Sequence, residues 1–183
     1  MAKVFVFFAD GMEEIEGLAQ VDLLRRAGNE VVSVSIMGRN EICGTHNVCI
    51  RADALFHETD FSEGDLFVLP GGGEGTQNLG ACGSLCDLLK EKHAAGKRIA
   101  AICAAPSVLA ALGLLNGKKA TVYPGMESQL DGAIYQDVPA VTDGLVTTGH
   151  GPGAAIDFGL ELIRQINGED KAAEIKKQLV YQH

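Results

Sequence analysis

The chain has 183 residues, 46% of them hydrophobic, which is enough for a sizeable core, and we expect one domain over residues 1–183. Its formal net charge of −9 argues against nonspecific nucleic-acid binding, which needs a basic surface. No apolar stretch has membrane-spanning length, and we interpret the short apolar run at the N-terminus as a first strand rather than a signal peptide.

The five cysteines do not suggest a small secreted scaffold, so a reducing cytoplasm is the simplest expectation and we predict ordinary buried or half-buried thiols. The segment CGTHNVC, with Cys43, His46 and Cys49, raises the possibility of a zinc site to which Cys82 and Cys86 would add sulfurs. The spacing fits no common zinc pattern, so no metal is expected.

Strand-like and helix-like segments alternate along the chain. Residues 3–9 form the first apolar run, typical of a strand buried on both faces. A helix follows, because apolar residues recur every three positions and Gly28 stands where a helix should stop; they are Ile15, Leu18, Val21 and Leu24. Asp10 and Glu13 have capping-box spacing at the entry to this helix.

The remaining segments continue the alternation. Strands are expected at 30–37, 65–70, 98–103, 119–123 and 144–149, and helices at 84–96, directly after residue 103, at 153–168 and at 170–182. This order predicts an α/β sandwich with a mostly parallel sheet, whose working site lies outside the carboxyl ends of its strands. Residues 10–16, 70–75, 103–106, 123–124 and 149–153 should therefore gather at one edge.

Two glycine-rich loops follow expected strands. LPGGGEGTQNL lacks the Lys–Ser/Thr ending of a phosphate loop, and GHGPGA matches the loose G-x-G-x-x-A form of a dinucleotide site. Pro152 lies inside the second motif and no further strand completes the unit, so a dinucleotide site is not favoured. We expect the exposed backbone N–H groups of both loops to hold an anion or an oxyanion instead.

Cys103 lies where a buried strand turns directly into a helix. A residue at such an elbow projects from a tight turn near the positive end of the helix, which favours the thiolate and lowers the thiol pKa from about 8.5. A reactive sulfur and a small residue chosen to fit the turn remain equally open on this ground alone.

Possible partners of the sulfur come from two regions. His150 lies at a strand end and should face the same edge, whereas His46 lies in a loop. The first helix offers Glu13, Glu14 and Glu16, and burial would raise the pKa of a carboxyl that faces the site. A favourable charge in the first helical turn is the more ordinary use of any one of these glutamates.

Several motifs in matching order, AAICAAPSVLA, VLPGG, ADGMEEIE, RRAG and GPGAAIDFGLELI, resemble the ThiJ/PfpI superfamily, in the branch of the DJ-one and bacterial ThiJ proteins. The resemblance runs essentially end to end. It implies a flavodoxin-like three-layer α/β/α sandwich, a homodimer, no cofactor, and a reactive cysteine on a strained nucleophile elbow, here Cys103.

The resemblance also assigns roles to other positions. It implies that Glu16 hydrogen-bonds the sulfur and that Arg26 lies near the dimer interface and the mouth of the site. The implied oxyanion donors are the backbone amides of Gly71, Gly72 and Ala104.

The chain departs from the superfamily at three positions. Tyr123 stands where many members carry a histidine before proline, which speaks against a Cys–His pair but leaves a hydrogen-bond donor for substrate. His46 and His150 stand where close relatives have arginine, so two fixed charges become titratable, and His150 is a candidate proton carrier.

The resemblance implies a cofactor-independent enzyme acting on α-oxoaldehydes or early glycation adducts, that is, a glyoxalase or deglycase that uses Cys103. The alternative is an oxidative-stress sensor or redox-dependent chaperone in which this cysteine is oxidised to sulfinate. A peptidase is weakened by Tyr123, and nothing in the sequence favours a role in the thiamine pathway.

Overall fold

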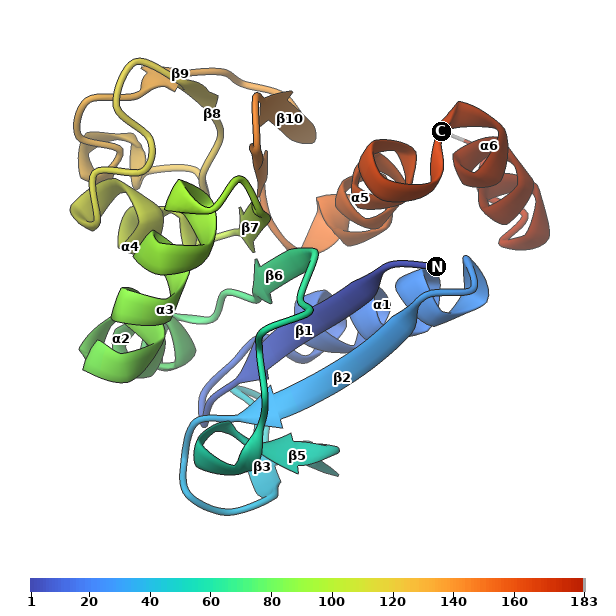
Figure 1. Cartoon of the computed structure of the whole chain (residues 1–183). Coiled ribbons are helices and arrows are strands. Elements are labelled where there is room, and N and C mark those ends of the chain that lie inside the picture. Colours follow the sequence, from blue (N-terminus) through green and yellow to red (C-terminus); the bar gives the residue numbers. More distant parts are fainter. Residues whose placement is uncertain (183) are drawn as a thin grey trace.

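A seven-stranded sheet forms the centre of the molecule in the computed structural model, which describes residues 1–182 (Figure 1). The strand order is β10-β11-β7-β6-β1-β2-β5, and all neighbours run parallel except β10 and β11. The strands are β1 (Lys3–Phe8), β2 (Glu30–Ser35), β5 (Ala54–Leu55), β6 (Leu66–Leu69), β7 (Arg98–Ile102), β10 (Ala140–Asp143) and β11 (Val146–Gly149). The predicted mostly parallel sheet is confirmed.

Helices cover both faces of this sheet. One layer holds α1 (Glu14–Arg26), α5 (Ala155–Asn167) and α6 (Glu169–Gln178), and the other holds α2 (Gly73–Ala81), α3 (Gly83–Ala94) and α4 (Pro106–Ala111) (Figure 1). Alternate side chains of β1 divide between two cores, Val4 and Val6 on the first side and Phe5 and Phe7 on the second. The three-layer α/β/α sandwich expected from the sequence is therefore confirmed.

Three short 3₁₀ turns complete the chain: η1 (Phe56–Glu58), η2 (Glu127–Gln129) and η3 (Pro152–Ala154). Within residues 1–182, no helix is both long enough and apolar enough to cross a membrane.

Two elements differ from the sequence prediction. The expected strand at 119–123 is reduced to β8 (Lys119–Ala120), which pairs with β9 (Ile134–Tyr135) in a separate small sheet. The chain leaves this pairing after Ala120 because its next amides find other acceptors. The N–H of Thr121 donates to the side chain of Thr148, and the N–H of Tyr123 donates to the carbonyl of Cys103. Helix α2 was not predicted, since three of its nine residues are glycines, which disfavour helices.

The start of α1 also differs in detail. Glu13, rather than Asp10, is the N-cap residue, and its carboxylate accepts the backbone N–H of Glu16 at 2.8 Å. Asp10 instead accepts the N–H of Cys43 at 3.1 Å and pairs with Arg39. The predicted capping pair was therefore wrong, although the helix itself is confirmed.

A disulfide joins Cys43 and Cys49 across the hairpin formed by β3 (Glu41–Cys43) and β4 (Cys49–Arg51). The two residues lie directly opposite each other in the antiparallel register, with their Cα atoms 4.0 Å apart. The prediction of ordinary thiols was wrong for this pair, because the hairpin places two residues that are six positions apart in the sequence directly opposite each other. Cys82, Cys86 and Cys103 are free.

Candidate active site

The carboxyl ends of the parallel strands meet at one edge, as the sequence predicted. Backbone hydrogen bonds join the segments there: Glu13 N to Gly71 O (3.0 Å), Gly75 N to Gly11 O (3.0 Å), Cys103 N to Gly149 O (2.9 Å) and Tyr123 N to Cys103 O (2.8 Å). Four stretches that are far apart in the sequence are thus fixed around one cysteine.

Cys103 follows β7 directly and has φ 65, a left-handed backbone conformation that residues with a side chain rarely adopt. Its backbone is held on both sides, by the carbonyl of Gly149 and the amide of Tyr123. The residue is 7% exposed. A strained conformation that its surroundings maintain is typical of functional sites and matches the nucleophile elbow expected from the sequence.

Glycines at 71 and 72 let two chain segments approach the elbow closely. A Cβ at Gly71 would lie 2.6 Å from Cβ of Cys103 and 2.7 Å from Oε2 of Glu16. A Cβ at Gly72, where φ is 92, would lie 2.3 Å from the carbonyl oxygen of Gly11. Both contacts are far below van der Waals distance, so this part of the site requires glycine.

Replacement of Gly72 by alanine is expected to lower the free energy of unfolding by about 2–4 kcal/mol, because strain at positive φ adds to the backbone clash. Chemical denaturation measures the change. Gly73→Ala is the matched control, since Gly73 meets no heavy atom within 4 Å, has no positive φ and begins a helix. Equal stability of the two variants would contradict the close approach at Gly72.

Glu16 lies in the first turn of α1 and is completely buried. Its Oε2 accepts the N–H of Gly71 at 2.8 Å, and the carboxyl interacts with the Cys103 thiol. Within residues 1–182 its other oxygen, Oε1, has no hydrogen-bond partner. Burial raises the pKa of Glu16, and the hydrogen bonds with Cys103 and Gly71 lower it. Burial has the larger effect, so the pKa rises to about 7.

Cys103 and Glu16 titrate as a pair. Burial, followed by the charge and the hydrogen bond of Glu16, raises the pKa of Cys103 to about 12, although the amides of Gly72 and Ala104 act in the opposite direction. The lowered pKa expected from the elbow was therefore wrong, because the sequence could not show how deeply the sulfur is buried. Because the pKa of the thiol is raised further than that of the carboxyl, the pair loses its two protons in separate steps.

The backbone amides around the pair divide into two roles. Those of Gly72 and Ala104 act on the sulfur and lower its pKa, so they favour negative charge at this position. The amide of Gly71 is already bonded to Glu16, so it orients the carboxyl and is not free to hold an oxyanion. An oxyanion role for the amides of Gly72 and Ala104 stays a prediction.

His150 and Tyr123 lie beside the elbow. The ring Nδ1 of His150 is 3.0 Å from Oγ1 of Thr121, and its backbone N–H bonds to the carbonyl of Pro139. Tyr123 is 46% exposed, and its ring lies over Gly151. Thr121, which fixes the His150 ring, was missed because a threonine in a strand-like segment carries no signal of such a role.

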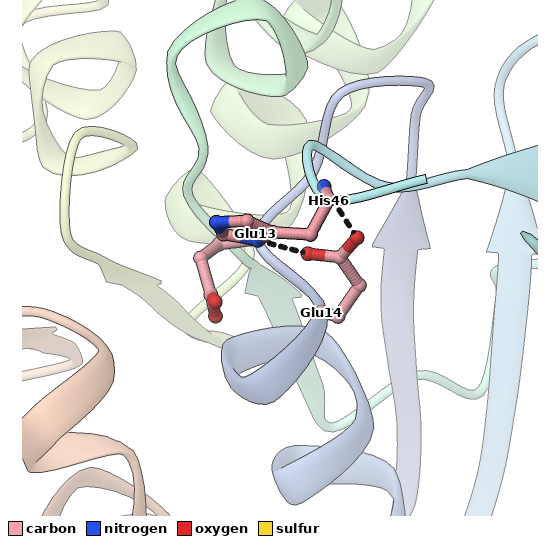
Figure 2. Close-up of side chains that lie close together, drawn as sticks. All are labelled: Glu13, Glu14 and His46. Carbon is pink, nitrogen blue, oxygen red and sulfur yellow. Dashed lines mark hydrogen bonds and ion pairs between the residues drawn. The ribbon is translucent and has the colours of Figure 1, made fainter. Parts of the chain in front are cut away.

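His46 is bonded to the first turn of α1. Its Nδ1 is 2.9 Å from Oε2 of Glu14, and its backbone N–H donates to Oε1 of the same carboxylate at 2.7 Å (Figure 2). The hydrogen bond and charge of Glu14 raise the pKa of His46. The hydrogen bonds from the His46 loop also lower the pKa of Glu14, although burial alone would raise it.

Among the described residues, one group of three side chains could in principle hold a metal ion. In Glu13, Glu14 and His46, the carboxylate oxygens and the ring nitrogen lie within 4.8 Å of one another (Figure 2). The carboxylate of Glu13 caps α1, and that of Glu14 holds the His46 loop, so hydrogen bonds within the chain account for the arrangement. The zinc set considered from the sequence does not form, because Cys43 and Cys49 are bonded to each other.

Arg26 does not reach this site within one chain. It lies near the end of α1, ten residues or about 15 Å beyond Glu16. Its Nε donates to Asp22 at 2.7 Å on the exposed side of the helix. A role for Arg26 at the mouth of the site therefore depends on a second copy of the chain.

Comparison with known proteins agrees with this arrangement. Residues 2–165 match the model of the DJ-1/PfpI family. The chain is similar to "Protein dj-1beta" of Drosophila melanogaster, with 37% identity over 97% of this chain and 96% of that protein. It is also similar to "Glutathione-independent glyoxalase DJ-1" of Schizosaccharomyces pombe, with 33% identity over 98% of each chain.

A solved structure, "Toxoplasma gondii DJ-1, oxidized", superposes with a TM-score of 0.96 and 36% identity over the full length of both chains. Fold, elbow and sequence thus agree, and the chain belongs to the DJ-1/PfpI family.

Proposed function

We propose that the chain is a cofactor-independent enzyme that converts α-oxoaldehydes such as methylglyoxal to hydroxy acids through Cys103. The observation that carries the proposal is the Cys103–Glu16 pair, buried beside two backbone amides that hold negative charge. A relative that is named a glutathione-independent glyoxalase supports it. Formation of lactate from methylglyoxal, without added cofactor, tests it.

The reaction follows from the arrangement of these groups. Glu16 accepts the thiol proton while sulfur adds to the aldehyde carbon, and the amides of Gly72 and Ala104 stabilise the oxygen that becomes negative. Glu16 returns its proton to this oxygen, so the product is a neutral hemithioacetal and Glu16 is again a carboxylate. Glu16 then takes the proton from the sulfur-bearing carbon and delivers it to the neighbouring carbon, while the hydroxyl proton passes to the neighbouring oxygen, which gives a thioester of the hydroxy acid. Water hydrolyses this thioester and restores the thiol.

The same first step would serve a deglycase, in which the sulfur attacks an early glycation adduct on a protein or nucleotide amine. The α-oxoaldehyde reaction needs no group beyond the ones described above. His150 is the second candidate for proton transfer, although its ring is bonded to Thr121 rather than to the sulfur. Tyr123, whose backbone N–H bonds to the carbonyl of Cys103, and His46, which is bonded to Glu14, are proposed to contact substrate.

A homodimer is part of this proposal. Apolar side chains are exposed on neighbouring parts of the surface, namely Ile15 and Leu18 on α1 and Val48 in the hairpin loop that bonds to Glu14. The proposed role of Arg26 at the mouth of the site would need such a second copy, because Arg26 lies ten residues beyond Glu16 on its own helix. Sedimentation velocity distinguishes the dimer from a monomer.

Oxidation of Cys103 is the second candidate function. The observation in its favour is Glu16, which in its protonated form can donate a hydrogen bond to a sulfinate oxygen. The solved relative from Toxoplasma gondii is described as oxidized. The protein would then act as a stress sensor or a redox-dependent chaperone.

Treatment with a modest excess of peroxide is expected to add the mass of two oxygen atoms at Cys103, because the buried carboxyl stabilises the sulfinate. Intact mass followed by peptide mapping locates the change. In Glu16→Gln the oxidation should no longer stop at this stage. Oxidation confined to Cys82 or Cys86 would contradict a sensor role for the elbow.

A further inference from the structure

An apolar cavity of about 440 Å³ lies beside the elbow. This volume is within the range of small-molecule sites, about 300–1,000 Å³. The side chains that form its wall are mainly apolar: Tyr123, Pro124, Val138, Pro139, Pro152 and Ala154. Because proline fixes its own backbone, three prolines give the cavity a wall that needs little rearrangement to accept a ligand.

The cavity adjoins the backbone segments that hold Cys103. Cys103 donates its N–H to Gly149, the residue before His150, and accepts the N–H of Tyr123 with its carbonyl oxygen. Tyr123 and His150 both line the cavity. The two segments that hold the elbow therefore also form the wall, so the cavity adjoins the segment of Cys103, although Cys103 does not itself line it.

The charged and polar groups of the cavity lie at its border. His150 is half-buried, with its Nδ1 directed to Oγ1 of Thr121, and Asp137 is exposed. Tyr123 presents an aromatic ring that is 46% exposed and free to cover an apolar group. An apolar substituent gains from burial here, whereas a charged or polyhydroxy substituent would lose hydration without new hydrogen bonds.

We propose that this cavity binds the substituent of the substrate, and that the enzyme prefers α-oxoaldehydes with an alkyl or aryl group over methylglyoxal. In the hemithioacetal the substituent is carried by the carbon next to the one bonded to sulfur, so it points away from the elbow while the oxygen stays on the amides. The inference rests on the proposed function, and it names the substrate class of the same site.

Comparison of phenylglyoxal with methylglyoxal measures the preference. The ratio of their kcat/KM values is expected to be about tenfold or more in favour of phenylglyoxal, as for other apolar groups that enter a pocket. Val138→Thr makes the wall polar at nearly constant volume, and Val138→Phe fills the cavity without adding polarity. Both should lower the ratio several-fold.

Val141→Thr is the matched control, because Val141 is also half-buried, lies three residues further along the same segment and does not line the cavity. It should leave the ratio unchanged. A wild-type ratio near one, or a ratio that Val138→Thr and Val141→Thr change equally, would overturn the proposal.

Binding without chemistry separates the cavity from the proposed reaction. In Cys103→Ala, acetophenone should shift the methyl NMR signals of Val138 and Ala154, whereas acetone at equal concentration should not. If these shifts appear in Cys103→Ala but the wild type turns over no α-oxoaldehyde, the cavity is supported and the proposed function is refuted. If the wild type turns over α-oxoaldehydes but Cys103→Ala does not show the shifts, the cavity is refuted and the function is retained.

Discussion

Cys103→Ala is expected to reduce conversion of methylglyoxal to lactate by at least about a thousandfold, because the thioester route has no other nucleophile at the site. Among the described residues, Cys82 and Cys86 lie on the segment that starts α3, and the remaining two cysteines are joined in a disulfide. Within residues 1–182, Cys103 is therefore the only cysteine at the elbow. A lactate assay with purified protein measures the loss.

Cys86→Ala is the control for this experiment. Cys86 is a free and half-buried thiol, but its sulfur contacts the carbonyl of Gly80 rather than a carboxyl, and burial raises its pKa. This variant should keep most of the wild-type rate. If Cys103→Ala forms lactate as fast as the wild type, the covalent mechanism is wrong, whatever the other residues do.

The sequence was a good guide to the fold because its signals were local and repeated. Continuous apolar runs predicted β1 and β7, and the parallel order then placed the strand ends at a single edge. Local signals failed where contacts between residues remote in the sequence determine the structure. The segment after Ala120 left its expected strand because Thr148 and Cys103, remote in sequence, supply its hydrogen-bond partners.

The apolar spacing of α1 shows a different limit. It predicted a helix correctly, yet Ile15 is 58% exposed and Leu18 is 41% exposed, while Glu16 and Gln20 are completely buried. Hydrophobic periodicity normally marks the buried face of a helix. Here the face that meets α5 and the sheet edge carries the carboxyl of Glu16 and a glutamine bonded to the carbonyl of Ala155. Functional sites are where such a rule is expected to fail.

Site residues were predictable by type more readily than by protonation state. Cys103 and Glu16 meet as the family resemblance implied. The direction in which the pKa of Cys103 shifts was not predictable. Burial and the nearby carboxyl raise this pKa, two backbone amides lower it, and the sequence does not show which effect is larger. The engagement of Gly71 with Glu16 was equally invisible, since glycine spacing does not say which acceptor an amide reaches.

Glu16→Gln is expected to reduce kcat/KM for methylglyoxal by about 100- to 10,000-fold, the usual contribution of a general base. The glutamine preserves the size of the side chain and can still accept the N–H of Gly71, so the fold should be retained. It cannot take the thiol proton or carry a proton between the two substrate carbons. Far-ultraviolet circular dichroism checks that the variant is folded.

The pH dependence of kcat/KM identifies the group that carries the proton. The pKa of Glu16 is about 7, so below this pH the carboxyl is protonated and cannot accept the thiol proton, and above it the carboxylate can. In the wild type kcat/KM should therefore rise with pH through about 7 and then level off, whereas in Glu16→Gln the residual rate should lack this rise.

His150→Gln decides between the two candidate proton carriers. Because His150 is bonded to Thr121 and Glu16 interacts with the sulfur itself, the rise near pH 7 should persist in this variant. Loss of the rise in His150→Gln, together with its retention in Glu16→Gln, would transfer the proton-carrying role to the histidine. Loss in both variants would mean that the proton passes through both groups, which the separation of their hydrogen bonds argues against.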